Sequence, residues 1–212
     1  MKPLYKDCKH NFVVLGLNLG CGPIMLKEVD GVDFINIDHD NMYEKYAQDQ
    51  DAKFIQYDLT KGLPTRDGLI PDRPVIINLS QFLEHLNLPD AENLLNDCYH
   101  VLESGGKIRI SVPDTELLMF HLKTNKMDEF ARVQPAKWYE RYQSQMMKFS
   151  LILFGSLHEN GDSGHKQCFD FNSLKELLEN IGFVKIRRVE HDPRYDAEVA
   201  ENHELVLIGE KP

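Results

Sequence analysis

The sequence predicts an α/β protein built on a doubly wound, mostly parallel β-sheet, and three observations lead to this prediction. Apolar runs with the composition of buried strands alternate with helix-like segments over the first half of the chain. One of them, VIINL at residues 75–79, is apolar throughout, as in a strand buried on both faces of a parallel sheet. The last two runs have no helix between them, so we expect them to pair antiparallel at one edge.

The first four strands are expected where apolar runs end in glycine-rich or polar segments, at residues 12–19, 34–38, 54–57 and 75–79. The first run enters a tight turn, Gly20-Cys21-Gly22-Pro23. A short helix fits residues 41–50. A longer helix fits residues 89–102, since proline suits a first turn and apolar residues then recur at helical spacing, at Leu94, Leu95, Cys98 and Leu102.

The middle of the chain departs from this alternation. A fifth strand is expected at residues 107–112, where the apolar run ends in proline. Residues 114–154 are mostly helix-like, with Asp114 or Thr115 able to cap the start. Residues 155–170 are polar and rich in glycine and histidine, which indicates a loop.

We interpret residues 1–212 as one domain in which residues 114–170 form a helical cap on the substrate side. Such a cap would cover the carboxyl ends of the strands, where open α/β sheets bind ligands. A further helix is expected at 174–181, capped by Asn172 or Ser173 and ended by the next glycine. The last two strands are expected at residues 183–190 and 204–209.

Composition and charge exclude several classes of protein. Hydrophobic residues make up 42% and charged residues 27%, which excludes disordered and fibrous chains. The net charge of −10 would repel a phosphate backbone, and the basic group Lys185, Arg187 and Arg188 is too small to offset it, so we expect no nucleic-acid partner. No stretch approaches the roughly 18 apolar residues of a membrane span, and the N-terminal residues are too polar for a secretory signal. The 4 cysteines include no C-x-x-C pair, which favours a cytoplasmic compartment and argues against structural zinc.

The strongest local motif is the glycine turn after the first strand. Glycine lets the backbone approach a ligand closely, and Asp38 ends the second strand eighteen positions after Gly20. In dinucleotide-binding folds a carboxylate about 20 residues on binds the ribose hydroxyls. Met25 stands where that motif has its third glycine, which argues against a pyrophosphate site. Taken alone, the turn is as compatible with a structural β-turn as with a ligand site.

Polar residues also follow the third and fourth strands. Asp58 ends the third strand, and Asn78 and Ser80 end the fourth. Because the carboxyl ends of parallel strands meet at one edge of a sheet, these groups and Asp38 would converge on one crevice.

The ordered series LNLGCG, FINID, FIQYDLTKGLP, INLSQFLEHL, LESGGKIRISVPD and FDFNSLKELLENIGFVKI resembles the class I S-adenosylmethionine-dependent methyltransferases. It is most similar to the small type-11-like methyltransferases that are often encoded near glycosyltransferases, and it covers most of residues 12–190. The resemblance implies a Rossmann-like seven-stranded sheet whose last strand is antiparallel. It also implies S-adenosyl-L-methionine as cofactor and a small-molecule or carbohydrate acceptor.

The resemblance assigns roles to the residues of the first two strand ends. Gly20 and Gly22 would face the methionine part of the cofactor, and Asp38 would hold the ribose diol. Cys21, inside the turn, joins this cofactor-binding set as a small packing residue rather than a nucleophile. Asn18 belongs to the set by position, but it stands where the family commonly has an acidic residue, so its contact with the cofactor amine is open.

At the next two strand ends, Asp58 would accept a hydrogen bond from the adenine amino group, with the Leu59 backbone amide beside the ring. Asn78 and Ser80 would line the floor near the sulfonium. Residues 66–73 replace the acidic, aromatic-rich segment that usually precedes the fourth strand in this family.

Two histidines are the candidate catalytic residues. A hydroxyl acceptor attacking a sulfonium methyl in line benefits from a base, most simply a histidine. His85 follows the fourth strand, and His165 lies in the loop that could close over a substrate. The alternatives, a helix-start residue bonded to backbone and a solvated loop residue, stay open. Glu84 is interpreted as a capping or ion-pair residue.

Other polar and aromatic groups carry weaker hypotheses. No metal site is predicted, because His158, Glu159, Asp162 and His165 match no known closed site. Aromatic residues of the expected cap could stack on a flat or sugar acceptor, although this spacing is also typical of a core, at Trp138, Tyr139 and Tyr142.

The main hypothesis is a methyltransferase that uses S-adenosylmethionine and acts on oxygen with histidine assistance. One alternative is a non-catalytic binding or regulatory module with a methyltransferase fold. Another is a nicotinamide-dependent oxidoreductase, which the glycine turn and Asp38 suggest and Met25 argues against.

Overall fold

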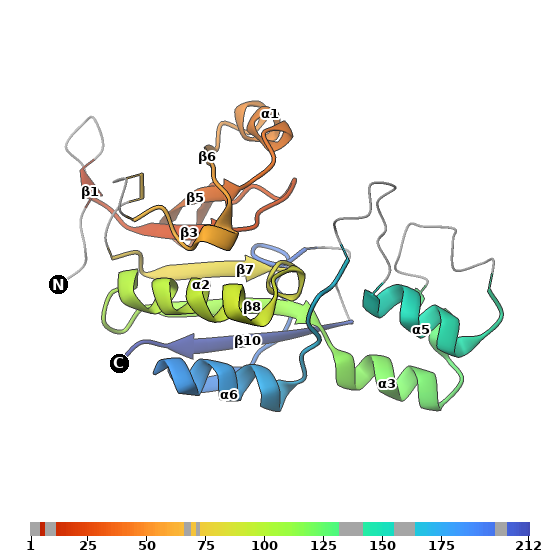
Figure 1. Cartoon of the computed structure of the whole chain (residues 1–212). Helices are drawn as coiled ribbons and strands as arrows, with labels where there is room; N and C mark the ends of the chain where they lie inside the picture. Colours follow the sequence, from red (N-terminus) through yellow and green to blue (C-terminus); the bar gives the residue numbers. More distant parts are fainter. Residues whose placement is uncertain are drawn as a thin grey trace.

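The computed structural model describes residues 5–6, 12–65, 69–70, 73–131, 142–154, 164–197 and 203–212. In this part of the chain a mostly parallel sheet forms the centre of the molecule, with helices against it and further helices beyond one end (Figure 1). The predicted α/β class and mostly parallel sheet are confirmed. No helix among these residues is both long enough and apolar enough to cross a membrane.

Within the described residues the central sheet has eight strands. Along the sheet the order is β4 (Glu28–Val29), β5 (Val32–Asp38), β3 (Leu15–Leu19), β7 (Ile76–Ser80), β8 (Lys107–Pro113), β10 (Glu204–Glu210) and β9 (Val184–Arg188), and β6 (Lys53–Gln56) also pairs with β5. The strands β3, β5, β6, β7 and β8 run parallel, whereas β10 runs antiparallel to both of its neighbours.

The sheet has one strand more than the seven that the resemblance implies. The additional strand is β4, which forms a short antiparallel hairpin with β5. Asp30 and Gly31 both have positive φ, 53° and 77°, as the tight turns of two-residue hairpins require. The predicted strand at residues 12–19 is divided in two, because β2 (Phe12–Val13) pairs with β1 (Tyr5–Lys6) in a separate small sheet.

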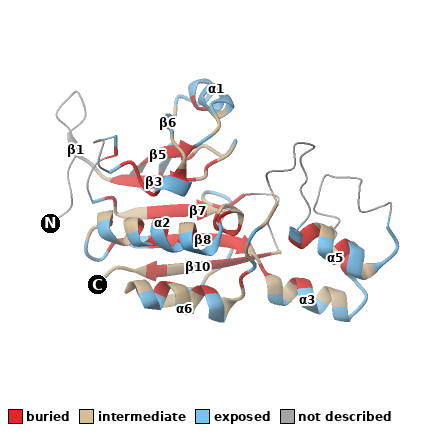
Figure 2. Ribbon diagram, viewed as in Figure 1, coloured by how far each residue is buried: buried red, intermediate tan, exposed pale blue. Residues whose placement is uncertain are grey.

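The main core lies between one face of the sheet and two helices, α2 (Leu88–Val101) and α6 (Phe171–Ile181). Figure 2 shows buried residues concentrated on the central strands, with the outward sides of these helices more exposed. Leu94, Leu95 and Cys98 are buried on α2, as their spacing predicts.

The cap of α6 differs from the prediction. Asp170, rather than Asn172 or Ser173, is the N-cap, and it forms a capping box with the backbone and hydroxyl of Ser173. Gly182 ends the helix in the left-handed conformation with φ 118°, as expected.

The helices of the predicted cap lie beyond the carboxyl ends of β7 and β8 (Figure 1). They are α3 (Thr115–Lys123), α4 (Met127–Ala131) and α5 (Gln145–Phe154), and they share an apolar cluster of their own, separate from the main core. Asp114 caps α3 by accepting a hydrogen bond from the Leu117 amide. Trp138 and Tyr139 lie outside the described residues, and Tyr142 is exposed.

The remaining helices are short. Helix α1 (Met42–Asp49) connects β5 to β6, while the single turns η1 (Leu59–Lys61) and η2 (Leu83–His85) follow β6 and β7. These turns place side chains directly at the carboxyl ends of parallel strands, which is the edge where open α/β sheets bind ligands.

Candidate functional site

The glycine turn follows β3 and is hydrogen-bonded to the carboxyl end of β5, where the Gly20 and Cys21 amides donate to the Ile37 carbonyl. Gly20 and Gly22 both have positive φ, 62° and 52°, which explains the need for glycine. Their surroundings differ. A Cβ on Gly20 would lie 2.1 Å from the ring of Phe82, so that ring fills the room next to Gly20, whereas nothing lies within 4 Å of a Cβ on Gly22. The open approach to the turn is therefore at Gly22.

Asp38 ends β5 beside this turn. Its carboxylate accepts hydrogen bonds from the Gly22 amide at 2.9 Å and the Asp40 amide at 3.2 Å, and the Nδ1 atom of His39 lies 3.1 Å away. Its side chain is 8% exposed. The two strand ends that the sequence assigns to the cofactor are thus joined directly. Cys21 is buried between them, and burial and the charge of Asp38 raise the pKa of its thiol, which argues against a nucleophilic role.

Asp58 follows β6 and caps the turn η1. Its carboxylate accepts hydrogen bonds from the Thr60 hydroxyl at 2.6 Å and the Thr60 amide at 3.1 Å, and pairs with Lys61 at 3.2 Å. The bond from the Thr60 hydroxyl is the main reason that the pKa of this carboxyl is lowered. The side chain is 41% exposed, so a ligand could reach it, while the side chain of Leu59 is buried in the core.

Asn18 and Asn78 belong to a buried row of asparagines that crosses three neighbouring strands. Asn18 pairs in register with Asn36 on one side and with Asn78 on the other. Its amide donates to Asn36 Oδ1 and to the Ile24 carbonyl, and Asn78 in turn donates to Asn18 Oδ1 and to the Tyr195 carbonyl. These side chains attach irregular segments to the sheet, which gives them a framework role, while their predicted contacts with the cofactor stay a prediction.

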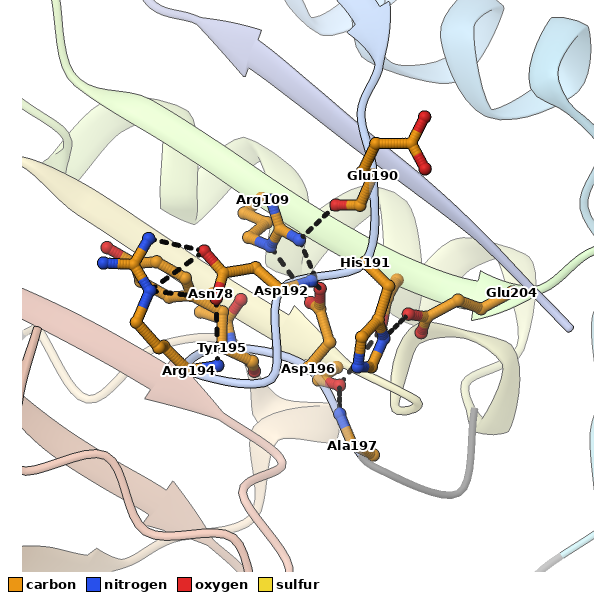
Figure 3. Close-up of polar contacts among 12 residues, drawn as sticks. Asn78, Arg109, Glu190, His191, Asp192, Arg194, Tyr195, Asp196, Ala197 and Glu204 are labelled. Atoms are coloured by element: carbon orange, nitrogen blue, oxygen red, sulfur yellow. Dashed lines mark hydrogen bonds and ion pairs between the residues drawn. The ribbon is translucent and has the colours of Figure 1, made fainter. Parts of the chain in front are cut away.

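The row continues on β8 with a buried ion pair between Arg109 and Asp196 (Figure 3). Arg109 donates to the Asp196 carboxylate from both Nε, at 3.0 Å, and Nη2. Its Nη2 also donates to the Glu190 carbonyl at 3.1 Å. The Asp192 amide donates to the same carboxylate. This pair fixes the segment after β9 against the sheet.

A chain of polar groups lies at the carboxyl ends of β7 and β8. The hydroxyls of Ser80 and Ser111 lie 3.0 Å apart, and the Ala197 amide donates to Ser80. The buried carboxylate of Glu204 is hydrogen-bonded to His191 and to the side chains of Ser111 and Gln81. Sequence analysis missed His191 and Glu204, because their only signal is that both flank the polar segment between the last two strands.

The two predicted catalytic histidines lie together. The rings of His85 and His165 meet edge to face with their centroids 4.9 Å apart. Burial, with a smaller effect of His85, lowers the pKa of His165 to about 4. Burial raises the pKa of Glu84 to about 8, and its Oε1 atom lies 4.0 Å from His85 Nε2. Glu84 is therefore a buried residue beside the histidines; of the two predicted roles, capping and ion pairing, its contact with His85 corresponds to the second. His158, Glu159 and Asp162 lie outside the described residues.

The basic group that the sequence singles out is largely neutralised. Lys185 pairs with Glu210 at 2.6 Å, and Arg188 pairs with Asp114 at 2.6 Å. Two of the positive charges of β9 are therefore paired with carboxylates of the same chain.

Comparison with known proteins identifies the fold. No protein-family model and no curated protein matches the sequence. Among solved structures, a SAM-dependent methyltransferase from Archaeoglobus fulgidus superposes with a TM-score of 0.57 at 16% identity, covering 99% of this chain and 89% of that one. The SAM-dependent methyltransferase SibL gives 0.58 at 13% identity over 94% of this chain, which spans 51% of SibL.

Human N-acetylserotonin methyltransferase, solved in complex with SAM, gives a TM-score of 0.52 at 14% identity, and the match covers 93% of this chain and 47% of that one. At these identities the likeness is one of fold. The chain has the Rossmann-like fold of the SAM-dependent methyltransferases.

Proposed function

We propose that this protein is a methyltransferase that uses S-adenosylmethionine to methylate a hydroxyl of a small-molecule or carbohydrate acceptor. The observation that carries the proposal is the contact between the Gly22 amide and the Asp38 carboxylate, at the carboxyl ends of adjacent strands in this fold. It sets an acidic side chain beside an open backbone turn, which suits a ligand with a ribose diol next to a charged tail.

The residues at this edge fit the cofactor. The open side of Gly22 leaves room for the methionine part, with Gly20 and Cys21 shaping the turn. Asp38 would accept from the ribose hydroxyls, and Asp58, which is partly exposed, would accept from the adenine amino group beside the Leu59 amide. Bound there, the cofactor supplies a methyl group on a cationic sulfur.

The acceptor side of the site is proposed at the carboxyl ends of β7 and β8. Ser80 lies at this edge, and His85 and His165 follow in the adjoining turn and loop. We assign to the two histidines the assistance that a hydroxyl needs in losing its proton as its oxygen bonds to the methyl carbon. The helices α3, α4 and α5, within residues 114–170 of a single domain, would form the acceptor-side cap.

Transfer of a labelled methyl group from S-adenosylmethionine to a panel of glycans, nucleotide sugars and small alcohols tests the proposal. We expect His85→Ala to lower kcat with little change in cofactor affinity, whereas Asp38→Ala weakens cofactor binding. His100→Ala, an exposed histidine on α2, is the matched control and should leave both unchanged. Transfer to nitrogen or carbon acceptors alone would contradict the choice of oxygen.

A non-catalytic binding module is the second candidate, and the position of Phe82 favours it. The ring of Phe82 occupies the room beside Gly20 that a cofactor would otherwise approach. This candidate predicts no methyl transfer to any member of the panel, whether or not the protein binds S-adenosylhomocysteine.

A further inference from the structure

Glu84, His85 and His165 form a cluster of side chains that are common metal ligands. One ligand atom of each, a carboxylate oxygen or a ring nitrogen, lies within 4.8 Å of the other two. The cluster is held by backbone hydrogen bonds as well. The Glu84 carbonyl accepts from the amides of Lys166 and Gln167 at 2.8 and 3.1 Å, so the turn η2 and the segment that carries His165 are joined.

The carboxylate of Glu84 is the feature that calls for an explanation. Its side chain is 2% exposed, and within the described part of the chain neither oxygen has a hydrogen-bond partner. A buried carboxylate without a hydrogen-bond partner is costly, and in native proteins such groups are paired or bind a metal. The neighbouring ligand atoms are imidazole nitrogens, so a cation shared among the three would compensate this carboxylate.

The orientation of His165 supports the same assignment. Its ring is hydrogen-bonded to the Leu153 carbonyl on α5. Histidine ligands of metals usually donate their other ring N–H to a carbonyl or carboxylate, which fixes the tautomer and aims the free nitrogen at the ion. His165 already has such a partner, provided by the cap.

A second cluster, His191, Asp196 and Glu204, has ligand atoms equally close together but lacks this feature. The carboxylate of Asp196 is paired with Arg109, and that of Glu204 is bonded to His191 and Gln81. Its charges are compensated within the protein, so it does not require an ion.

We propose that Glu84, His85 and His165 bind one divalent transition-metal ion through a carboxylate oxygen and two imidazole nitrogens. Two histidines and one carboxylate are the ligands of many catalytic zinc and non-haem iron sites, which keep a further position open. Tetrahedral ligands about 2.1 Å from zinc lie about 3.4 Å apart. The three side chains therefore move together by about an ångström when the ion binds.

The consequence for catalysis rests on the proposed function, although metal binding itself does not. An acceptor hydroxyl in the open position would have its pKa lowered by the ion and would lose its proton to water. Its oxygen would then form the new bond to the methyl carbon as the bond from that carbon to the sulfonium sulfur breaks, with S-adenosylhomocysteine as the leaving group. The two histidines would then assist the reaction as ligands and not as proton acceptors.

The test is a titration of the metal-free full chain with Zn²⁺, in competition with a chromophoric chelator. We expect one ion per chain, and affinity lower by about a hundredfold or more in Glu84→Gln and His165→Ala. Co²⁺ should give the visible absorption of a four- or five-coordinate site in the wild type and lose it in both variants. His100→Ala should bind Zn²⁺ as the wild type does.

Thermal unfolding separates loss of the ion from loss of the fold. Glu84→Gln preserves shape and replaces a buried ionisable carboxyl with a neutral amide, so without metal it should unfold at or above the wild-type temperature. Added Zn²⁺ should then raise the midpoint of the wild type and not that of the variant. Asp38→Ala should keep Zn²⁺ affinity while losing S-adenosylhomocysteine, so failure of the metal site and failure of the cofactor site are distinguishable.

Two results would overturn the proposal. One is the absence of Zn²⁺ and Co²⁺ binding by the wild-type chain. The other is binding with equal affinity in Glu84→Gln and His165→Ala, which would place the ion elsewhere.

Discussion

Gly20 and Gly22 have nearly the same backbone conformation, but only Gly20 is packed against a side chain. A Cβ at either position carries the strain of positive φ, and at Gly20 it also collides with the ring of Phe82. The need for glycine therefore has one cause at Gly22 and two at Gly20.

We expect Gly20→Ala to reduce the free energy of unfolding by about 2 to 5 kcal/mol, from strain plus overpacking. Gly22→Ala should cost about 1 to 2 kcal/mol, from strain alone. Urea unfolding measures both. Adding Phe82→Ala to Gly20→Ala should recover part of the loss, and equal losses at the two glycines would contradict the packing of Phe82 against the turn.

At the scale of elements, the row of buried asparagines holds irregular segments of the chain against the sheet face opposite α2 and α6, by hydrogen bonds from side-chain amides to backbone carbonyls. Asn36 donates to the carbonyls of Leu26 and Lys53 and accepts from the Leu26 amide, while Asn18 and Asn78 extend the bonding to residues 24 and 195. The side-chain amides of Asn18 and Asn36 each donate and accept, so a carboxylate at either position would lose the donated bonds.

Asn18→Asp therefore provides a sharp test, because it introduces the residue type that the methyltransferase family commonly has at this position. The new carboxylate would face the Ile24 carbonyl and Asn36 Oδ1, two acceptors, in a site that is 2% exposed. We expect a loss of about 3 kcal/mol or more in urea unfolding at pH 7. Asn96→Asp, the same change on an exposed helix position, should stay within about 0.5 kcal/mol. An unchanged midpoint with tighter S-adenosylhomocysteine binding would instead return Asn18 to the cofactor site.

The start of α6 has a pH dependence set by its cap. Hydrogen bonds from the amide and hydroxyl of Ser173 lower the pKa of Asp170 below 3.8, so this cap stabilises the fold above that value and is lost as the pH falls through the lower, folded-state pKa. Asp170→Ala should cost about 1 kcal/mol at pH 7. The difference from wild type, measured by urea unfolding, should shrink as the pH falls below about 4. Asp170→Asn keeps the acceptor oxygen and should show a smaller loss, and a difference that is constant with pH would contradict the role of the carboxylate.

At the scale of the whole molecule, Arg109 and Asp196 hold the last part of the chain against the sheet. Arg109→Met would leave the Asp196 carboxylate buried, with the Asp192 amide as its remaining hydrogen-bond donor among the described residues. We expect a loss of about 3 to 5 kcal/mol in the free energy of unfolding. Arg109→Met combined with Asp196→Leu should recover much of it. A single variant as stable as the wild type would show that the pair does not secure this segment.

Much of the architecture follows from local sequence. Alternating apolar runs, Pro89 and Gly182 mark strands and helices within a few residues of their observed ends. The sequence analysis missed the hairpin of β4, although Asp30-Gly31 between two valines is a typical turn sequence. The reason is that β4 has 2 residues, too few to show a strand pattern, before the 7 residues of β5.

The candidate site was predicted less completely, since its partners come from distant parts of the chain. Asp38 and Gly22 could be identified from spacing and resemblance. The hydrogen-bond partners of Asn18 could not be predicted. The motif gives its position after the first strand, but an asparagine there and the acidic residue that the family commonly has would fit the same position. Glu84 was interpreted as a capping or ion-pair residue, and only the approach of the segment with His165 shows that it is buried.

The central claim is that the edge formed by Gly22, Asp38 and Asp58 binds S-adenosylmethionine. Thermal unfolding with S-adenosylhomocysteine tests it most directly, with NADH as the control ligand. At about 100 times Kd, binding adds roughly 2.7 kcal/mol, which raises the midpoint of a chain this size by about 5–10 °C.

We predict this shift for the wild type and for Asp33→Ala, at the other end of β5, and its loss in Asp38→Ala. No shift with S-adenosylhomocysteine, or an equal shift with NADH, would contradict the account.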